Sequence, residues 1–66
     1  MDKRATVFKV ALAKNKMTQY DLAEKLGISQ GTVNGFIKTL KAGGKPQAAT
    51  AQKYADALGI PVEKLL

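Results

Sequence analysis

The sequence predicts an all-α domain. Apolar residues recur every three or four positions, helix-capping residues precede these stretches, and no segment alternates apolar and polar residues as a strand does. Sixty-six residues suffice for one domain, which we assign to residues 1–66. A chain this short buries only about 60% of the surface that its unfolded form exposes, so the core must be small. Cysteine is absent, so packing of the helices, rather than disulfides, must stabilise the fold.

The first predicted helix lies within residues 2–16, where Asp2 is placed to cap it. The second spans about residues 18–26. Thr18 and Asp21, three positions apart, are typical of a capping box at its start. Gly27 follows this helix, which favours a left-handed residue at its end. The buried stripe of the first helix is expected to consist of Ala5, Phe8, Ala11 and Leu12.

A third helix is expected over about residues 29–40, with Ser29 as its cap. The turn that separates it from the second helix is too short for anything but a helix-turn-helix crossing. Gly43, Gly44 and Pro46 then predict a loop, because together they interrupt any helical pattern. The buried side of the third helix would carry Val33, Phe36 or Ile37, and Leu40.

A fourth helix is expected from Gln47 to Leu58, closed by Gly59. A fifth helix of one or two turns should begin with Pro61, a residue that the first helical position tolerates. Two roles are open for Leu65 and Leu66 at the end of the fifth helix: they complete the core, or they form part of a dimer interface. On the fourth helix the buried residues would be Ala48, Ala51, Tyr54, Ala55 and Leu58. We assign the aromatic residues Phe8, Phe36 and Tyr54 to the core rather than to a base-stacking surface.

The charge of the chain is unevenly distributed. Eleven Lys and Arg residues against five Asp and Glu residues give a net charge of +6. No acidic residue occurs from Lys25 to Ala55, whereas this window holds Lys25, Lys38, Lys41, Lys45 and Lys53. A basic surface of this kind attracts polyanions and binds nucleic acid with a strong dependence on salt. The alternative is a solvated face that serves only solubility.

The residue types give no indication of catalysis. The chain has no His and no Cys. Its carboxylates Asp21, Glu24, Asp56 and Glu63 fall on predicted exposed faces, without metal-ligand spacing. We therefore expect no enzyme activity, no cofactor, no metal and no small-molecule substrate. The longest apolar run is far shorter than the roughly 20 residues of a membrane span, so we expect a cytoplasmic protein without a membrane partner.

Small polar residues mark the outward side of the third helix. In a helix-turn-helix unit, the first helix crosses the DNA backbone and the start of the second enters the major groove. The amides of Gln30 and Asn34 suit adenine N6 and N7, and Thr32 offers a hydroxyl and a methyl group. Free N–H groups at the start of the preceding helix, beside Thr18 and Gln19, predict a phosphate site.

Two stretches together, MTQYDLAEKLGISQGTVNGFIK and ATAQKYADALGIPVEKLL, resemble the lambda-repressor-like helix-turn-helix domains of phage repressors and Cro proteins. The resemblance covers roughly residues 5–66. It implies a compact five-helix domain that binds double-stranded operator DNA, usually as a homodimer on a two-fold-related site. The nearest alternative is an antitoxin-type protein of the same fold, which binds a toxin as well as DNA. A further alternative is a helical bundle that only binds proteins.

The resemblance also implies roles for individual residues. Gln30 matches a glutamine that commonly reads a base, and Gly31 and Gly35 fall where other members often carry base-contacting side chains. The expected base contacts are Gln30, Gly31, Thr32 and Asn34. The expected phosphate contacts are Thr18, Gln19, Tyr20, Ser29, Lys38, Lys41 and Lys45. Each glycine costs roughly 1 kcal/mol in a helix interior. We therefore hypothesise that Gly31 and Gly35 let the third helix approach DNA closely.

Overall fold

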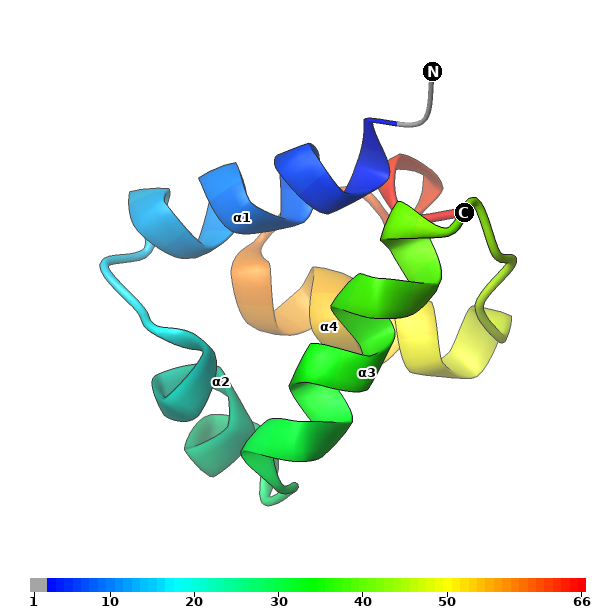
Figure 1. Cartoon of the computed structure of the whole chain (residues 1–66). Coiled ribbons are helices and arrows are strands. Elements are labelled where there is room, and N and C mark those ends of the chain that lie inside the picture. The colour runs from blue at the N-terminus through cyan, green and yellow to red at the C-terminus, as the bar shows by residue number, and fades with distance from the viewer. Residues whose placement is uncertain (1–2) are drawn as a thin grey trace.

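The α-helices form close to the segments predicted for the first four helices (Figure 1). The computed structural model describes residues 3–66, and within this range there is no strand, which confirms the all-α prediction. The elements are α1 (Arg4–Lys14), α2 (Gln19–Leu26), α3 (Gln30–Lys41), α4 (Ala48–Leu58) and the 3-10 helix η1 (Val62–Lys64). The expected cap Asp2 lies outside the described residues. Lys3 occupies the N-cap position of α1, without a side-chain capping bond.

The last element corrects the prediction of a fifth α-helix. Val62–Lys64 forms a single 3-10 turn, so the described residues contain four α-helices. Pro61 precedes this turn in an extended conformation, with ψ of 139°, rather than opening a helix. A segment this short gains too few hydrogen bonds to offset the cost of nucleating an α-helix, and 3-10 geometry is common in such pieces. The turn places Leu65 in the core, whereas Leu66 remains 44% exposed.

The caps of α2 and α3 match the prediction. The Asp21 N–H donates to Thr18 Oγ1 at 3.1 Å, and the Thr18 N–H donates to Asp21 Oδ2 at 2.9 Å, which completes a capping box. Gly27 ends α2 in the left-handed conformation, with φ of 68°. Ser29 Oγ accepts from the Thr32 N–H at 3.1 Å. Caps of this kind each contribute about 1 kcal/mol and define where each helix begins.

An aromatic cluster joins three helices at the centre of the core. Phe36 of α3 stacks on Tyr54 of α4 with ring centroids 4.2 Å apart, and Phe8 of α1 lies 5.5 Å from Phe36. The three aromatic rings are buried, as predicted. Both Phe36 and Ile37 are buried on α3, but Ala48 is exposed, contrary to expectation. Ala48 is the first residue of α4, where the helix has not yet reached the core.

Side-chain hydrogen bonds to backbone carbonyls connect elements that are distant in sequence. Asn15, at the end of α1, donates to the Leu58 carbonyl at 3.0 Å. Arg4, at the start of α1, donates to the carbonyls of Gly44 at 2.6 Å and Leu65 at 3.3 Å. These bonds hold α1 against the end of the chain, which leaves α2 and the first turn of α3 at the opposite end of the molecule (Figure 1).

Candidate nucleic-acid interface

The helix α3 has one buried face and one free face. Val33, Phe36, Ile37 and Leu40 are buried, which confirms the predicted core side. The residues expected to contact bases lie on the other side and are exposed: Gln30, Gly31, Thr32 and Asn34. A helix whose apolar stripe is fully covered presents its remaining side to solvent as a rigid surface.

The polar side chains on this free face differ in whether they already form hydrogen bonds within the domain. The amides of Gln30 and Asn34 make no hydrogen bond to any residue in the range 3–66. The Thr32 hydroxyl, in contrast, lies 2.9 Å from Ser29 Oγ, within hydrogen-bonding distance. A hydroxyl has one donor and two acceptor positions, so this pair still leaves each oxygen able to bind a further group. Both amides are therefore available to bind a ligand.

The two glycines of α3 are not required by the fold. A Cβ at Gly31 would lie 3.8 Å from Ser29 Oγ, which is ordinary van der Waals contact, and a Cβ at Gly35 would meet nothing within 4 Å. Both positions are exposed, and neither has a positive φ. Since glycine is unfavourable in a helix and nothing in the domain excludes alanine here, the fold itself does not explain either residue.

The beginning of α2 lies beside the beginning of α3. Tyr20, which is 59% exposed, lines a shallow pocket of about 310 Å³ together with Ser29 and Gln30. The structure therefore brings together residues expected to contact phosphates and a residue expected to contact a base. The carboxylate of Glu24 lines the same pocket. Its charge disfavours a phosphate inside the pocket and favours the hydrogen-bond donors of a base edge.

Backbone donors are free at the N-terminus of α2. The first two residues of the helix, Gln19 and Tyr20, have N–H groups that no carbonyl of the helix can reach. Gln19 is half-buried, whereas the cap Thr18 is exposed. Thr18 Oγ1 already accepts from Asp21, so this hydroxyl holds the helix end in place in addition to any contact with a ligand. Such an end attracts anions, because its N–H groups carry partial positive charge.

Lysines continue this surface past the end of α3. Lys38 and Lys41 lie in its last turn, and Lys45 follows in the loop; all three are exposed. None of them forms an ion pair with a carboxylate of residues 3–66. Lys25 differs, because its ammonium donates to the Ala57 carbonyl at 3.3 Å.

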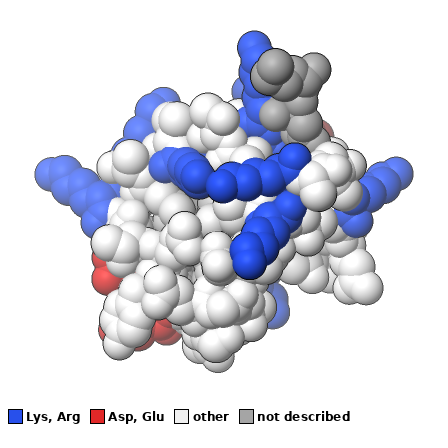
Figure 2. Space-filling view, in the orientation of Figure 1, with Lys and Arg blue, Asp and Glu red and all other residues white. Residues whose placement is uncertain are grey.

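Lys9 of α1 is a further basic residue of this surface, one that was not among the predicted DNA contacts. The side chain of Lys41 lowers the pKa of Lys9 from its usual value of 10.5, because its donor group and its positive charge both disfavour a second ammonium beside it. Figure 2 shows basic side chains over the region where α1 approaches the end of α3. Acidic side chains appear at the edge of this face, near α2. Spacing along the chain could identify Lys9 as exposed, but not as a neighbour of Lys41.

Two adjacent glycines shape the loop that carries Lys45. Gly43 is left-handed, with φ of 77°. The Gly44 N–H donates to the Thr39 carbonyl at 2.8 Å, and a Cβ at Gly44 would lie 2.9 Å from Thr39 Cγ2 and 3.1 Å from the Thr39 oxygen. The predicted loop is thus a tight turn against α3, and only glycine fits at its second position without a shift.

A family model described as helix-turn-helix matches residues 8–65. The chain belongs to the lambda-repressor-like helix-turn-helix family. Comparison with curated proteins and with solved structures gave no match. This is a DNA-binding regulatory family and not typically an enzymatic one. The α2–α3 unit is therefore the helix-turn-helix of a domain that binds double-stranded DNA.

Two other kinds of feature, a metal-ligand cluster and a membrane-spanning helix, are absent from the described residues. Among residues 3–66, no three His, Cys, Asp or Glu side chains converge in a way that could hold a metal ion. Within the same range, no helix has both the length and the apolar character of a membrane span.

Proposed function

We propose that this helix-turn-helix protein is a sequence-specific transcriptional regulator of the Cro or phage-repressor type, which inserts α3 into the major groove of operator DNA. The observation that carries the proposal is the pair of free, exposed amides of Gln30 and Asn34 on α3. Both belong to the half of α3 that lies nearest α2. A helix with uncommitted amides at its start suits recognition of base edges.

Base readout is assigned to four residues. Gln30 and Asn34 each offer a donor and an acceptor, which matches N6 and N7 of adenine. Thr32 offers its methyl group to a thymine methyl, since its hydroxyl is shared with Ser29. Gly31 contributes by lacking a side chain, which allows the backbone of α3 to approach a base pair closely.

Phosphate contacts are assigned to residues that surround this helix. On one side, the N-terminus of α2 would bind a phosphate through backbone N–H groups and the side chains of Thr18, Gln19 and Tyr20, with Ser29 nearby. On the other side, Lys38, Lys41 and Lys45 would bind phosphates of the flanking backbone, and we add Lys9 because of its position beside Lys41. These contacts position the protein, whereas the base contacts specify the sequence.

We further propose that two copies bind a two-fold-related operator. In the helix-turn-helix class, the half-sites of such an operator lie about one helical turn apart, roughly 34–36 Å. A symmetric operator doubles the number of base contacts available to a domain with only one short recognition helix. Binding would repress transcription if the operator overlaps a promoter.

Selection of bound duplexes from a random pool, followed by footprinting, tests the proposal. We expect one enriched sequence with two-fold symmetry, and an affinity that falls steeply with salt, with a log–log slope of about −0.9 for each phosphate contacted. Enrichment of no sequence, or an affinity independent of salt, would contradict operator binding. Enrichment of a single asymmetric site would contradict only the proposal that two copies bind, and not operator binding itself.

A further inference from the structure

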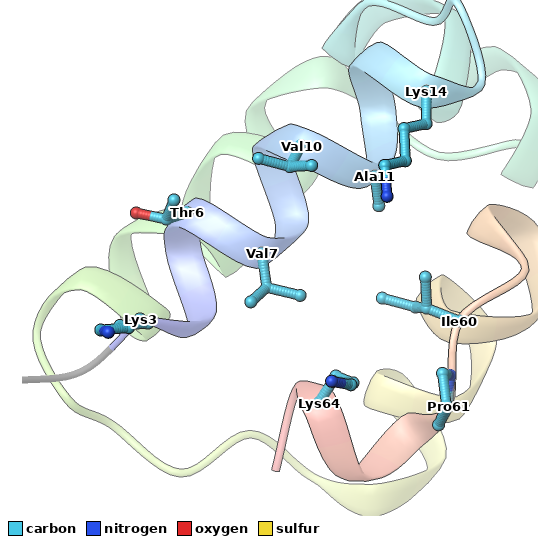
Figure 3. A pocket seen from close by; sticks show the side chains of 9 residues that line it. All are labelled: Lys3, Thr6, Val7, Val10, Ala11, Lys14, Ile60, Pro61 and Lys64. Carbon is cyan, nitrogen blue, oxygen red and sulfur yellow. The ribbon is translucent and has the colours of Figure 1, made fainter.

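A groove lies between α1 and η1, away from the helix-turn-helix. It has a volume of about 340 Å³ and is lined by α1 on one side and by Ile60, Pro61 and Lys64 on the other. Figure 3 shows Val7 and Ile60 pointing into it from opposite sides. Val10 of α1 is 47% exposed at this groove, so a large apolar side chain stands open to solvent there.

The groove combines an apolar floor with a basic rim. Its charged lining residues are Lys3, Lys14 and Lys64, and no acidic residue lines it. In Figure 3 these lysines stand at different places around the apolar residues rather than on one side. None of the three forms an ion pair with a carboxylate of residues 3–66. An occupant must therefore bring apolar side chains for the floor and negative charge for the rim.

This combination selects among possible occupants. A second copy of the chain would place the same three lysines of each copy near one another, in a protein whose net charge is already +6. DNA phosphates would match the rim but would leave Val7, Val10 and Ile60 without a partner. An acidic amphipathic helix satisfies both parts, since it lays an apolar stripe into a groove while its flanking carboxylates meet lysines.

We propose that this groove is a docking site for an acidic, amphipathic helical segment of a partner protein. The volume, at the lower end of the range of about 300–1,000 Å³ for binding pockets, accommodates a few apolar side chains of such a segment rather than a whole folded surface. The groove lies beside η1, near the end of the chain, whereas α2 and the first turn of α3 lie at the other end of the domain (Figure 1). The partner therefore binds while α3 remains free to contact DNA.

The test uses a synthetic helical peptide with leucines at positions i, i+3 and i+7 and glutamates on both flanks, and a control peptide with the same residues in shuffled order. Binding is measured by titration of the ¹⁵N-labelled domain, with chemical shifts read residue by residue. We expect a roughly micromolar Kd for the patterned peptide. The shift changes should centre on Val7, Val10 and Ile60 and leave Gln30 and Asn34 unmoved.

Matched variants distinguish binding of the peptide in the groove from non-specific electrostatic attraction of an acidic peptide to a basic protein. Val10→Glu places a carboxylate inside the groove and should weaken the patterned peptide by about tenfold or more. Ala13→Glu makes the same charge change at an exposed position of α1 outside the groove and should have little effect. Lys64→Glu should weaken binding more than Lys53→Glu, which alters a lysine of α4 that does not line the groove.

Several results would overturn the proposal. The first is that the patterned peptide does not bind, or that the shuffled peptide binds equally well. The second is that both variants of a pair lose the same amount of affinity for the patterned peptide. The third is that the chemical shifts change with protein concentration alone, which would indicate a second copy of the chain as the occupant. Operator binding by Val10→Glu and Ala13→Glu should be equal. If Val10→Glu alone lost operator binding, the groove would be assigned to DNA instead. If the unmodified protein bound no operator, the proposed function would fail, but the peptide result would still support the groove as a docking site.

Discussion

Lys9 on α1 and Lys41 at the end of α3 form a pair of neighbouring like charges, and the interaction with the Lys41 side chain lowers the pKa of Lys9. Like charges held together on an exposed surface favour the binding of an anion, because the anion relieves their repulsion. The pair also joins α1 to the surface that α3 presents. This arrangement leads to the first prediction.

Binding of DNA should raise the pKa of Lys9. A phosphate stabilises the ammonium form, so the complex takes up a proton at pH values between the pKa of Lys9 in the free protein and that in the complex. Affinity should accordingly fall as the pH rises through the free-protein value. NMR titration of the Lys9 Nζ in free and bound protein measures both values. Lys9→Ala should remove this pH dependence and Lys53→Ala should retain it; an unchanged Lys9 pKa would argue against a phosphate at this pair.

Gln30→Ala and Lys41→Ala should weaken DNA binding in different ways. Loss of the Gln30 amide should cost about 1–3 kcal/mol at one operator base pair and relax specificity there. Loss of Lys41 should weaken all duplexes about equally and reduce the slope of log affinity against log salt by about one. Binding to a set of operators with single substitutions, at several salt concentrations, distinguishes the two effects. If both variants behave alike, α3 does not read bases as proposed.

Gly31→Ala and Gly35→Ala should stabilise the domain and weaken DNA binding. Each alanine gains roughly 1 kcal/mol of helix propensity, and the surrounding atoms leave room for its methyl group. A domain of this size should then melt about 4–8 °C higher for each substitution. Thermal unfolding and operator titration on the same samples provide the measurement. Tighter DNA binding in both variants would refute the close approach of α3.

Tyr54 should make the fold sensitive to alkaline pH. Burial raises the pKa of its phenol above the usual value of 10.0, so the folded state favours the neutral form. This contribution is fully present below pH 10 and is lost as the pH rises through the folded-state pKa. In urea unfolding at neutral and alkaline pH, Tyr54→Phe should lose less stability on alkalinisation than the unmodified protein. Tyr20→Phe, at an exposed position, is the control and should lose as much stability on alkalinisation as the unmodified protein.

Much of the fold was predictable from short segments of sequence. The capping box of Thr18 and Asp21, the left-handed Gly27 and the cap Ser29 all depend on residues within a few positions of one another. Their physical causes are local hydrogen bonds and backbone sterics, which act in the same way wherever the helix lies in the fold. The helical period likewise identified the aromatic core residues Phe8, Phe36 and Tyr54.

Other features depended on how the helices pack. The 3-10 turn at Val62–Lys64 replaces the predicted fifth helix, with Leu65 docked in the core, and Ala48 is exposed because the start of α4 has not reached the core. The candidate site was predicted as a set of residues along α2 and α3. Their roles in DNA binding stay a prediction, whereas their exposure and mutual placement come from the structure.

The sequence by itself determined the four α-helices, the helix-turn-helix and its polar outward face, because caps, turns and helical periodicity are properties of neighbouring residues. Only the tertiary structure decided that Lys9 meets Lys41, that Tyr20 shares a pocket with Gln30, and that α1 and η1 enclose a groove. These relationships join residues of different helices. They follow from the packing of whole helices on the aromatic core, which no short segment encodes alone.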